Sequence, residues 1–366
     1  ILGSNILRCP SKKWQLCAMQ WDNFFFGPVR LGEHVLADFQ QWLDQLDEPF
    51  STVHVLVDSN TLTHCLPELM SQVPALAQCE VLEVDPGEET KSMAIVEQCW
   101  MSLLETGADR QSLLISLGGG VVTDLGGMLA STFMRGIAHV SMPTSLLGMV
   151  DAGIGGKHGV NVFGVKNLAG CFLESVYVAI WPGFLSTLPD EQFRAGFAEV
   201  VKHAILSGGE LWEAVQGLTH LRDSGSMIDM AAQVKIQAVT ADPFENSDSR
   251  KALNLGHGLA HAIETVSQGQ VSHGDAVASG LWMEVAMAEN LALIDPDDVA
   301  AIHAVLDRHW PRCTFTEGLW EALQSDKKRS KSKVMLSLSV GIGKGIAMTE
   351  VQAKDVHSAI AHHVAS

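Results

Sequence analysis

The sequence predicts an α/β protein, with a doubly wound parallel sheet in its first half and a mainly α-helical second half. Short apolar runs alternate with amphipathic helical patterns up to about residue 180. Beyond that point the strand signals fade, and helical patterns follow one another. We therefore expect an N-terminal domain over residues 1–180 and a C-terminal helical domain over residues 181–366, with the boundary near Trp181-Pro182-Gly183.

Strands and helices alternate through the first half. Turn residues such as Asp58-Ser59-Asn60 and Asp85-Pro86-Gly87-Glu88 follow the first two apolar runs. A strand, a helix and a further strand in succession imply parallel pairing, with helices on both faces of the sheet. The expected strands are 53–58, 79–84, 112–117 and 138–142, and the expected helices are 90–107 and 122–134.

Helical patterns dominate the second half. Only one late apolar run, at 333–339, indicates a strand there. The expected helices are 190–217, 228–241, 250–267, 274–293 and 297–308.

The composition is that of an enzyme of ordinary type. The hydrophobic content of 47% is ample for two cores, and no apolar run reaches the roughly 18 residues of a membrane span. The 24 basic and 42 acidic residues give a net charge of -18, which argues against nucleic acid and anionic membranes as partners. Against this negative balance, we expect any local cluster of lysine and arginine to bind something anionic.

The seven cysteines are scattered and form no CxxC pair. Free thiols in a reducing compartment are the simplest account, so we expect a cytoplasmic protein. The chain opens Ile-Leu-Gly-Ser without an initiator Met, which leaves open a fragment, a processed form or part of a larger polypeptide.

A glycine turn joins the third expected strand to the next helix. Gly118, Gly119 and Gly120 can present backbone N–H groups and a helix start to a phosphate. Acidic and polar side chains at this and other strand ends suit a ribose hydroxyl, which favours NAD as the dinucleotide. An unliganded strand-to-helix turn is the alternative. The candidate side chains are Asp58, Asn60, Glu88, Lys91 and Asp124.

Cationic side chains gather in a glycine-rich middle segment. Lys157 follows Gly155-Gly156, and Lys166-Asn167 follows Gly164. Together with Arg135 these residues could bind a phosphate or carboxylate. The alternative is a hairpin that carries solvated surface lysines.

The histidine-rich segment carries the strongest functional signal. Arg250, Asn254, His257 and His261 are spaced at about one helical turn, so in a continuous helix they share one face. His273 returns beside a glycine, and Glu199 is the natural third ligand for a divalent metal held by His257 and His273. The alternatives are surface histidines on a helix and a simple Glu199–Lys202 ion pair.

Several separate motifs follow one another along the chain. They are GGGVVTDLGG, MRG, PTSLLGMVDAGIGGK, KN, GFAEVVKH, RKALNLGHGLAHAIE and HGDAVASG. Together these motifs resemble the 3-dehydroquinate synthase family, a group of sugar-phosphate cyclases. The resemblance runs from about Asp58 to Lys328 and implies an NAD-binding α/β domain, a helical metal-binding domain and a homodimer. Zinc is the implied metal, with cobalt as a second possibility.

The resemblance assigns roles residue by residue. The implied metal ligands are Glu199, His257 and His273. The implied substrate-pocket residues are Asp151, Lys157, Lys166, Asn167, Lys202, Lys235, Arg250, Asn254 and His261. Arg135 matches an arginine that reaches the substrate phosphate of the neighbouring subunit, and one of Lys327 and Lys328 is expected in the site. The implied NAD-binding residues are Asp58, Asn60, Glu88, Lys91, Gly118, Gly119, Gly120, Asp124, Thr144 and Ser145.

The resemblance implies a lyase reaction on a small-molecule sugar phosphate. A hydroxyl is oxidised transiently with NAD, phosphate is eliminated, the ketone is reduced again, and the ring closes by an intramolecular aldol step. Arg250 and Lys235 offer the cationic pair that a carboxylate needs, which favours 3-deoxy-arabino-heptulosonate 7-phosphate over substrates without a carboxylate. The expected activity is therefore that of the shikimate pathway.

Departures from the usual motifs keep other functions open. His158 and Gly258 stand where the family usually has threonine, Ala260 replaces a glycine, and Ser332 replaces another glycine. The segment 242–250 is one residue longer than the common form. The alternatives are a cyclase of secondary metabolism, a metal-dependent NAD polyol dehydrogenase, and a catalytically silent relative that binds a nucleotide or a partner.

Overall fold

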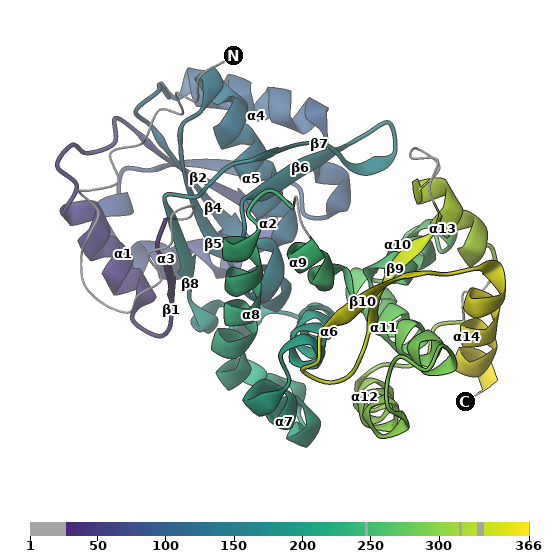
Figure 1. The fold of residues 1–366 in the computed structure, drawn as a ribbon. Coiled ribbons are helices and arrows are strands. Elements are labelled where there is room, and N and C mark those ends of the chain that lie inside the picture. Colours follow the sequence, from purple (N-terminus) through teal and green to yellow (C-terminus); the bar gives the residue numbers. More distant parts are fainter. Residues whose placement is uncertain (1–26, 246–247, 315–316, 328–332, 366) are drawn as a thin grey trace, which may run out of the picture.

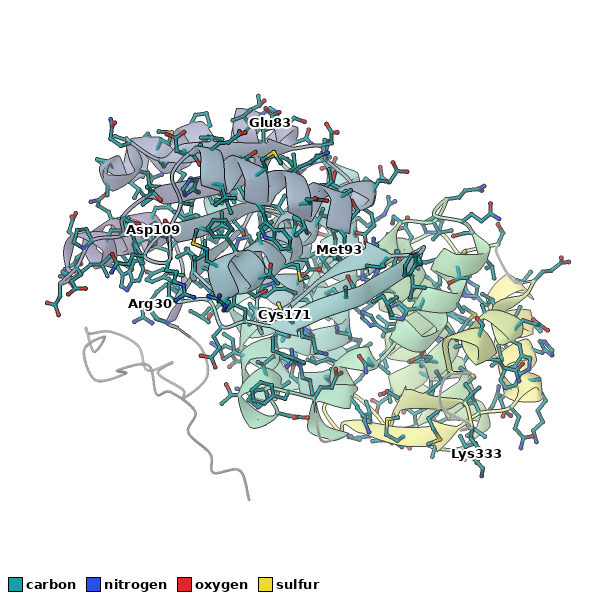
Figure 2. All side chains as sticks on the ribbon, turned by 90° about the horizontal axis from the view of Figure 1, so that it is seen from above. Arg30, Glu83, Met93, Asp109, Cys171 and Lys333 are labelled. Atoms are coloured by element: carbon teal, nitrogen blue, oxygen red, sulfur yellow. The ribbon has the colours of Figure 1, made fainter. Side chains whose placement is uncertain are left out.

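The computed structural model describes residues 27–245, 248–314, 317–327 and 333–365 (Figure 1). A sheet-bearing half and a helical half lie side by side. Figure 2 shows Glu83 and Asp109 in the sheet-bearing half and Lys333 at the far end of the helical half. No helix in the described ranges is long and apolar enough to span a membrane.

A six-stranded parallel sheet forms the centre of the first half, which confirms the predicted fold class. The strand order is β1-β8-β5-β4-β2-β3. Sequence analysis missed the two short strands β1 and β8, which pair with each other. The strands are β1 (Val29–Leu31), β2 (Val53–Asp58), β3 (Glu80–Val84), β4 (Leu113–Gly118), β5 (Ala138–Pro143) and β8 (Tyr177–Ile180).

Helices cover both faces of this sheet because successive strand residues are apolar and point to opposite faces. Val55 and Val57 of β2 face one core, and Leu56 between them faces the other. The first core is shared with α1 (Val35–Asp44), α2 (Ser59–His64) and α3 (Leu66–Gln72), and the second with α4 (Met93–Glu105) and α5 (Gly120–Thr132).

Two features after β5 lead toward the helical half. A π-helical turn, η4 (Gly148–Ala152), carries Asp151. An antiparallel hairpin of β6 (Lys157–Val162) and β7 (Val165–Phe172) packs on α5 and extends toward the helical half (Figure 1). The lysine-bearing middle segment is therefore a hairpin, but one that projects over the junction between the two halves.

The second half is helical around a buried central helix, α11 (His273–Asn290), which packs against α6, α10, α12 and α14. Its core is continuous with one face of the sheet. The late strand pairs with a second strand that sequence analysis missed. The other elements are α6 (Asp190–Ser207), α7 (Gly209–Gly217), α8 (Met227–Ala241), α9 (Asp248–Lys251), η7 (Ala252–Asn254), α10 (His257–Val266), α12 (Pro296–His309), α13 (Leu319–Lys327), β9 (Met335–Ser339), β10 (Ile346–Glu350) and α14 (Ala353–Ala365).

Two predicted helices are each broken by a glycine with positive φ. Gly208, at φ +62°, separates α6 from α7, and Gly256, at φ +80°, separates η7 from α10. The prediction of one continuous helix over 250–267 was wrong, and Arg250, Asn254 and His257 do not share a helix face. The backbone of Gly256 is left-handed, and His257 starts a new helix after it.

Candidate active site

Three potential metal ligands converge from three helices. Glu199 lies within α6, whereas His257 and His273 are the first residues of α10 and α11. The Nε2 atoms of His257 and His273 lie 3.3 Å and 3.5 Å from Glu199 Oε1. Gly274 permits this approach, since a Cβ there would lie 2.1 Å from Ala195 Cα on α6.

The donor set fits a divalent cation. Glu199 is fully buried, and neither of its carboxylate oxygens makes a well-oriented hydrogen bond within the described residues. Tetrahedral bonds of about 2.0–2.2 Å to one ion place two ligand atoms about 3.3–3.6 Å apart, as found here. One carboxylate and two imidazoles are ligands that zinc accepts, and they leave coordination positions for a substrate.

Charge at this triad favours a bound cation. Burial alone would raise the pKa of Glu199, but Lys202 and His257 hold it well below its usual range. Burial alone would lower the pKa of His273, but Glu199 and Glu264 raise it to about 10. The carboxylate thus stays ionised and attracts a positive charge, which a divalent cation can supply while the His273 proton is released.

A cationic cluster lies next to the triad around Asp151. Lys235 Nζ donates to Asp151 Oδ1 at 2.8 Å, and Lys202 Nζ lies 3.8 Å from the same oxygen and also pairs with Glu199. Although burial opposes its ionisation, Lys202 and Lys235 hold the pKa of Asp151 far below its usual range. Burial, and in smaller part the charges of Lys202 and Arg250, lower the pKa of Lys235.

Arg250 is buried beneath the turn that leads into β6. Its guanidinium donates to the carbonyls of Gly155, at 3.3 Å, and Pro243. Gly155 has φ +109°, and a Cβ there would lie 3.0 Å from Arg250 Nη2, so glycine is needed at this contact. At the start of β6, Lys157 pairs with Glu245, which lies in the same loop as Pro243.

The proposed nucleotide residues lie at the carboxyl edge of the sheet. Gly118 ends β4, and Gly119 precedes α5 without any side-chain cap. A Cβ on Gly119 would lie 3.3 Å from Ser145 Oγ, and Thr144 donates its N–H to the Gly118 carbonyl. At the end of β2, Asp58 caps α2, which carries the exposed Asn60. This arrangement leaves backbone N–H groups at the start of α5 for a phosphate.

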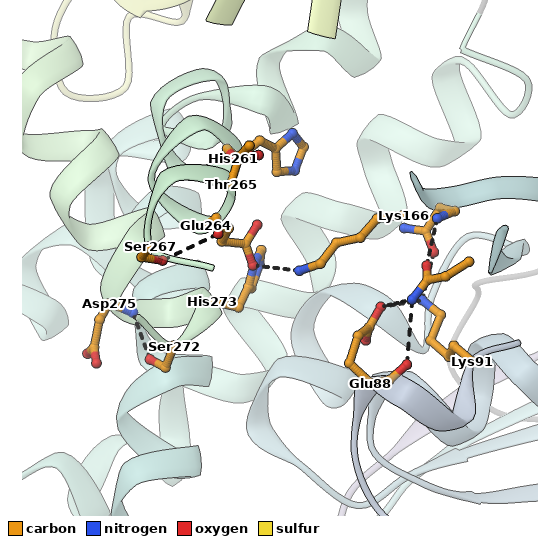
Figure 3. Close-up of polar contacts among 12 residues, drawn as sticks. Glu88, Lys91, Lys166, His261, Glu264, Thr265, Ser267, Ser272, His273 and Asp275 are labelled. Carbon is orange, nitrogen blue, oxygen red and sulfur yellow. Dashed lines mark hydrogen bonds and ion pairs between the residues drawn. The ribbon is translucent and has the colours of Figure 1, made fainter. Parts of the chain in front are cut away.

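A hydrogen-bonded network joins the remaining nucleotide candidates to the hairpin. Lys91 Nζ donates to Asp124 Oδ2 and to Asn167 Oδ1, each at 2.7 Å. Asn161 on β6 donates to Glu88 Oε1 at 2.9 Å (Figure 3). Burial raises the pKa of Asp124 to about 6, against the opposing charge of Lys91. The network therefore ties the hairpin to the sheet edge.

Other predicted residues lie at the margin of the site or away from it. Asn254 and His261 are exposed, and the rings of His261 and His257 are 5.8 Å apart. Arg135 precedes β5 and so lies at the amino edge of the sheet, opposite the site. Lys328 lies outside the described residues, as does the side chain of Lys327.

Sequence analysis missed several residues that contact the site. Glu264 on α10 lies 3.3 Å from His273 Nδ1 and 3.0 Å from Lys166 Nζ (Figure 3). It is seven residues after His257, a spacing that places both on one helix face and could have identified it. Three further contacts have no short-range pattern that could have indicated them. They are Glu245 with Lys157, Asn161 with Glu88, and His203 with Asp151.

Comparison with known proteins identifies the family. Residues 81–195 match the family model "3-dehydroquinate synthase N-terminal", and residues 196–329 match "3-dehydroquinate synthase C-terminal". The chain is 32% identical over 318 residues to the 3-dehydroquinate synthase of Parabacteroides distasonis, covering 84% of this chain and 89% of that protein. It is 40% identical over 270 residues to that of Pyrococcus furiosus, covering 72% and 79%.

A solved structure shows the same fold. The 2-epi-5-epi-valiolone synthase of Streptomyces hygroscopicus subsp. jinggangensis, with NAD+ and Zn2+ bound, matches with a TM-score of 0.82 at 24% identity. The match covers 96% of this chain and 99% of that chain. The two family models together span more than half of the sequence. This chain therefore belongs to the 3-dehydroquinate synthase family.

Proposed function

We propose that this chain converts 3-deoxy-arabino-heptulosonate 7-phosphate to 3-dehydroquinate and phosphate, in the shikimate pathway. The observation that carries the proposal is the convergence of Glu199, His257 and His273 beside the buried cluster of Lys202, Lys235 and Asp151. The membership of the family supports it. When bound, NAD supplies a hydride acceptor and donor, and a divalent cation supplies Lewis-acid activation of a substrate hydroxyl.

The buried cations bind and orient the acidic substrate. Lys235 and Arg250 are placed to bind its carboxylate, because both are buried and lie close enough for their charges to interact. Lys202 and Lys235 are buried, and the Asp151 carboxylate fixes their ammonium groups. This arrangement holds the reacting atoms in one geometry, and such preorganisation accelerates the reaction.

We assign the phosphate end of the substrate to the exposed margin of the site. Lys157, Asn254 and His261 supply donors there, and His261 lies beside the ring of His257. In this proposal Asn254 and His261 orient the leaving phosphate so that it can take up the proton of the adjacent C–H group. Asp58 and the turn at Gly119 would hold the dinucleotide at the carboxyl edge of the sheet, where N–H groups at the start of α5 would be available to its phosphates.

We further propose a homodimer in the cytoplasm, with the chain divided into domains at residue 180. The location of Arg135 at the amino edge of the sheet supports the dimer, because it points to a role outside the site of its own chain. Cys65, Cys79, Cys99 and Cys171 are free thiols, in keeping with a reducing compartment. The sheet ends with β8 at Ile180, where the proposed boundary lies.

An assay that follows phosphate and NADH together tests the function. Phosphate release from the heptulosonate phosphate without NADH build-up is the expected result. Steady accumulation of NADH would identify a polyol dehydrogenase, and turnover only of sugar phosphates without a carboxylate would identify a cyclase of secondary metabolism. A chain that binds NAD but turns over none of these substrates would be the catalytically silent relative.

A further inference from the structure

The two candidate histidine ligands occupy equivalent places on neighbouring helices. His257 is the first residue of α10, and His273 is the first residue of α11. The two helices pack against each other. Each helix also carries a carboxylate that contacts the start of the other helix, Glu264 on α10 and Glu284 on α11.

Glu264 fixes the orientation of His273. Its Oε1 atom lies 3.3 Å from His273 Nδ1, and only the Nδ1–H form of the imidazole can donate to a carboxylate. Nε2 then faces Glu199 Oε1, 3.5 Å away, and is the ring atom left to bind a metal. The carboxylate is largely buried and is also paired with the half-exposed Lys166 at 3.0 Å, so its charge is compensated (Figure 3).

Glu284 fixes the backbone on both sides of His257. Its Oε2 accepts the N–H of Gly256 at 2.6 Å, and its Oε1 accepts that of Leu259 at 3.3 Å. Helix α10 has no side-chain N-cap of its own. The fully buried carboxylate of Glu284 takes that place, where N–H groups of a first turn and the positive end of the helix dipole favour an anion.

Gly258 makes room for this carboxylate. A Cβ at residue 258 would lie 3.2 Å from Glu284 Oε1 and 2.3 Å from Leu336 Cδ2. A larger side chain would displace Leu336 and crowd the carboxylate. Gly280 permits the same close packing from α11, since a Cβ there would lie 2.1 Å from the Gly256 carbonyl oxygen. Glycines on both helices thus allow the close packing around the buried Glu284.

We propose that Glu264 and Glu284 are reciprocal positioning residues for the metal site. Each is carried by one ligand-bearing helix and fixes the ligand at the start of the other. The proposal rests on the metal site of the proposed function. Outer carboxylates that orient metal-binding histidines are worth about 10–100-fold in metal affinity when they are lost.

The test measures zinc affinity of the metal-stripped full chain by competition with a chromophoric chelator, with no turnover involved. Glu264→Ala and Glu284→Gln should each raise the Kd for zinc by about 10–100-fold, and Glu264→Gln should do so less, because its amide oxygen still accepts. Glu289→Gln, at an exposed position on α11, is the matched control and should bind zinc as the wild type does. Lys166→Met removes the ion pair with Glu264 but keeps the contact between Glu264 and His273. It should raise the Kd for zinc less than Glu264→Ala does.

Two further measurements separate positioning from general damage. The Kd for NAD, which reports the sheet-bearing half, should not change. The visible spectrum of the Co2+-loaded variants should differ from that of the wild type, because the ligand geometry changes, whereas a purely structural role would leave it as it is. Glu284→Asp keeps the charge on a shorter side chain and serves as the second variant at that position.

A different result would contradict each part of the proposal. A wild type that binds neither zinc nor cobalt would remove the metal site itself and with it the proposed function. A wild type that binds zinc, with variants that keep its Kd and the cobalt spectrum, would overturn the positioning roles alone. If both Glu284 variants lose their helical circular dichroism, Glu284 is a residue of the folding core and its assigned role is wrong.

Discussion

Lys235 Nζ donates to Asp151 Oδ1 across 2.8 Å, and this contact joins α8 of the helical half to the turn η4 that follows β5. Lys202 and His203, both on α6, face the same carboxylate. All of these side chains are buried or nearly so. Asp151 is therefore the shared anion of a cluster whose cations have little access to water.

Asp151→Asn should destabilise the fold by about 3–5 kcal/mol, because it leaves buried ammonium groups without their counter-charge. Urea denaturation monitored by circular dichroism measures the loss. The matched control is Glu350→Gln, which removes an exposed ion pair with Lys333 and should cost less than about 1 kcal/mol. Equal losses in the two variants would contradict the account of the buried cluster.

Metal removal should abolish turnover and leave NAD binding intact. The candidate ligands belong to α6, α10 and α11, whereas the nucleotide candidates lie at the sheet edge. Dialysis against a chelator followed by phosphate-release and NAD-titration measurements tests this, and added zinc should restore activity. Full turnover by a metal-free sample would exclude the proposed chemistry.

Arg250→Ala should impair substrates with a carboxylate far more than analogues without one. A hydrogen bond to a charged group contributes about 1.5–3 kcal/mol, which corresponds to roughly a 10- to 150-fold loss in kcat/KM for the carboxylate substrate. Arg250→Lys keeps the charge and should retain part of that activity. An equal loss for both substrate classes would leave Arg250 with only its structural contacts to Gly155 and Pro243.

The stability of the sheet-bearing half should fall in acid because of His158, a residue found where the family usually has threonine. Burial lowers the pKa of His158 to about 4. Between about pH 6.5 and pH 4 the unfolded chain binds a proton at this residue that the folded protein does not, so stability falls as the pH falls. The full contribution is roughly 3 kcal/mol.

His158→Thr should reduce this acid dependence in urea unfolding curves recorded between pH 7 and pH 4, and the part that remains belongs to other histidines such as His54 and His139, whose pKa values burial also lowers. The control His357→Thr, at an exposed position, should keep the wild-type slope. Parallel curves for the wild type and His158→Thr would show that the folded and unfolded chains protonate this residue over the same pH range, against the prediction.

Complementation between two inactive variants tests Arg135. Arg135→Ala leaves the metal triad intact, and Glu199→Gln leaves Arg135 intact. If Arg135 acts on the site of the neighbouring subunit, mixed dimers contain one complete site and mixing after mild unfolding should restore part of the activity. If confirmed mixed dimers remain inactive, Arg135 acts within its own subunit and not on the site of its neighbour.

The parallel sheet could be predicted because its information is local. The runs at β2, β3, β4 and β5 are short and rich in apolar residues, and Asp58, Asp85, Gly118 and Pro143 mark their ends. The strands β1 and β8 escaped prediction because three or four residues carry too little pattern. The break at Gly256 escaped it because an apolar helical period continues through the glycine in the sequence.

The site was only partly accessible from the sequence. Residue type and spacing indicated Glu199, His257 and His273, and the structure places their ligand atoms together. Glu264 and Glu284 look like ordinary helix residues, and their roles follow from how α10 crosses α11. Glu245 reaches Lys157 from a distant part of the chain, and no local signal encodes such a contact.

A single turn of α6 carries Glu199, Lys202 and His203, and this turn faces both the metal triad and the Asp151 cluster. Any shift of that turn alters ion coordination and anion recognition at once. Selection for a different metal would therefore change the preferred substrate as well, and the two traits would have to evolve together.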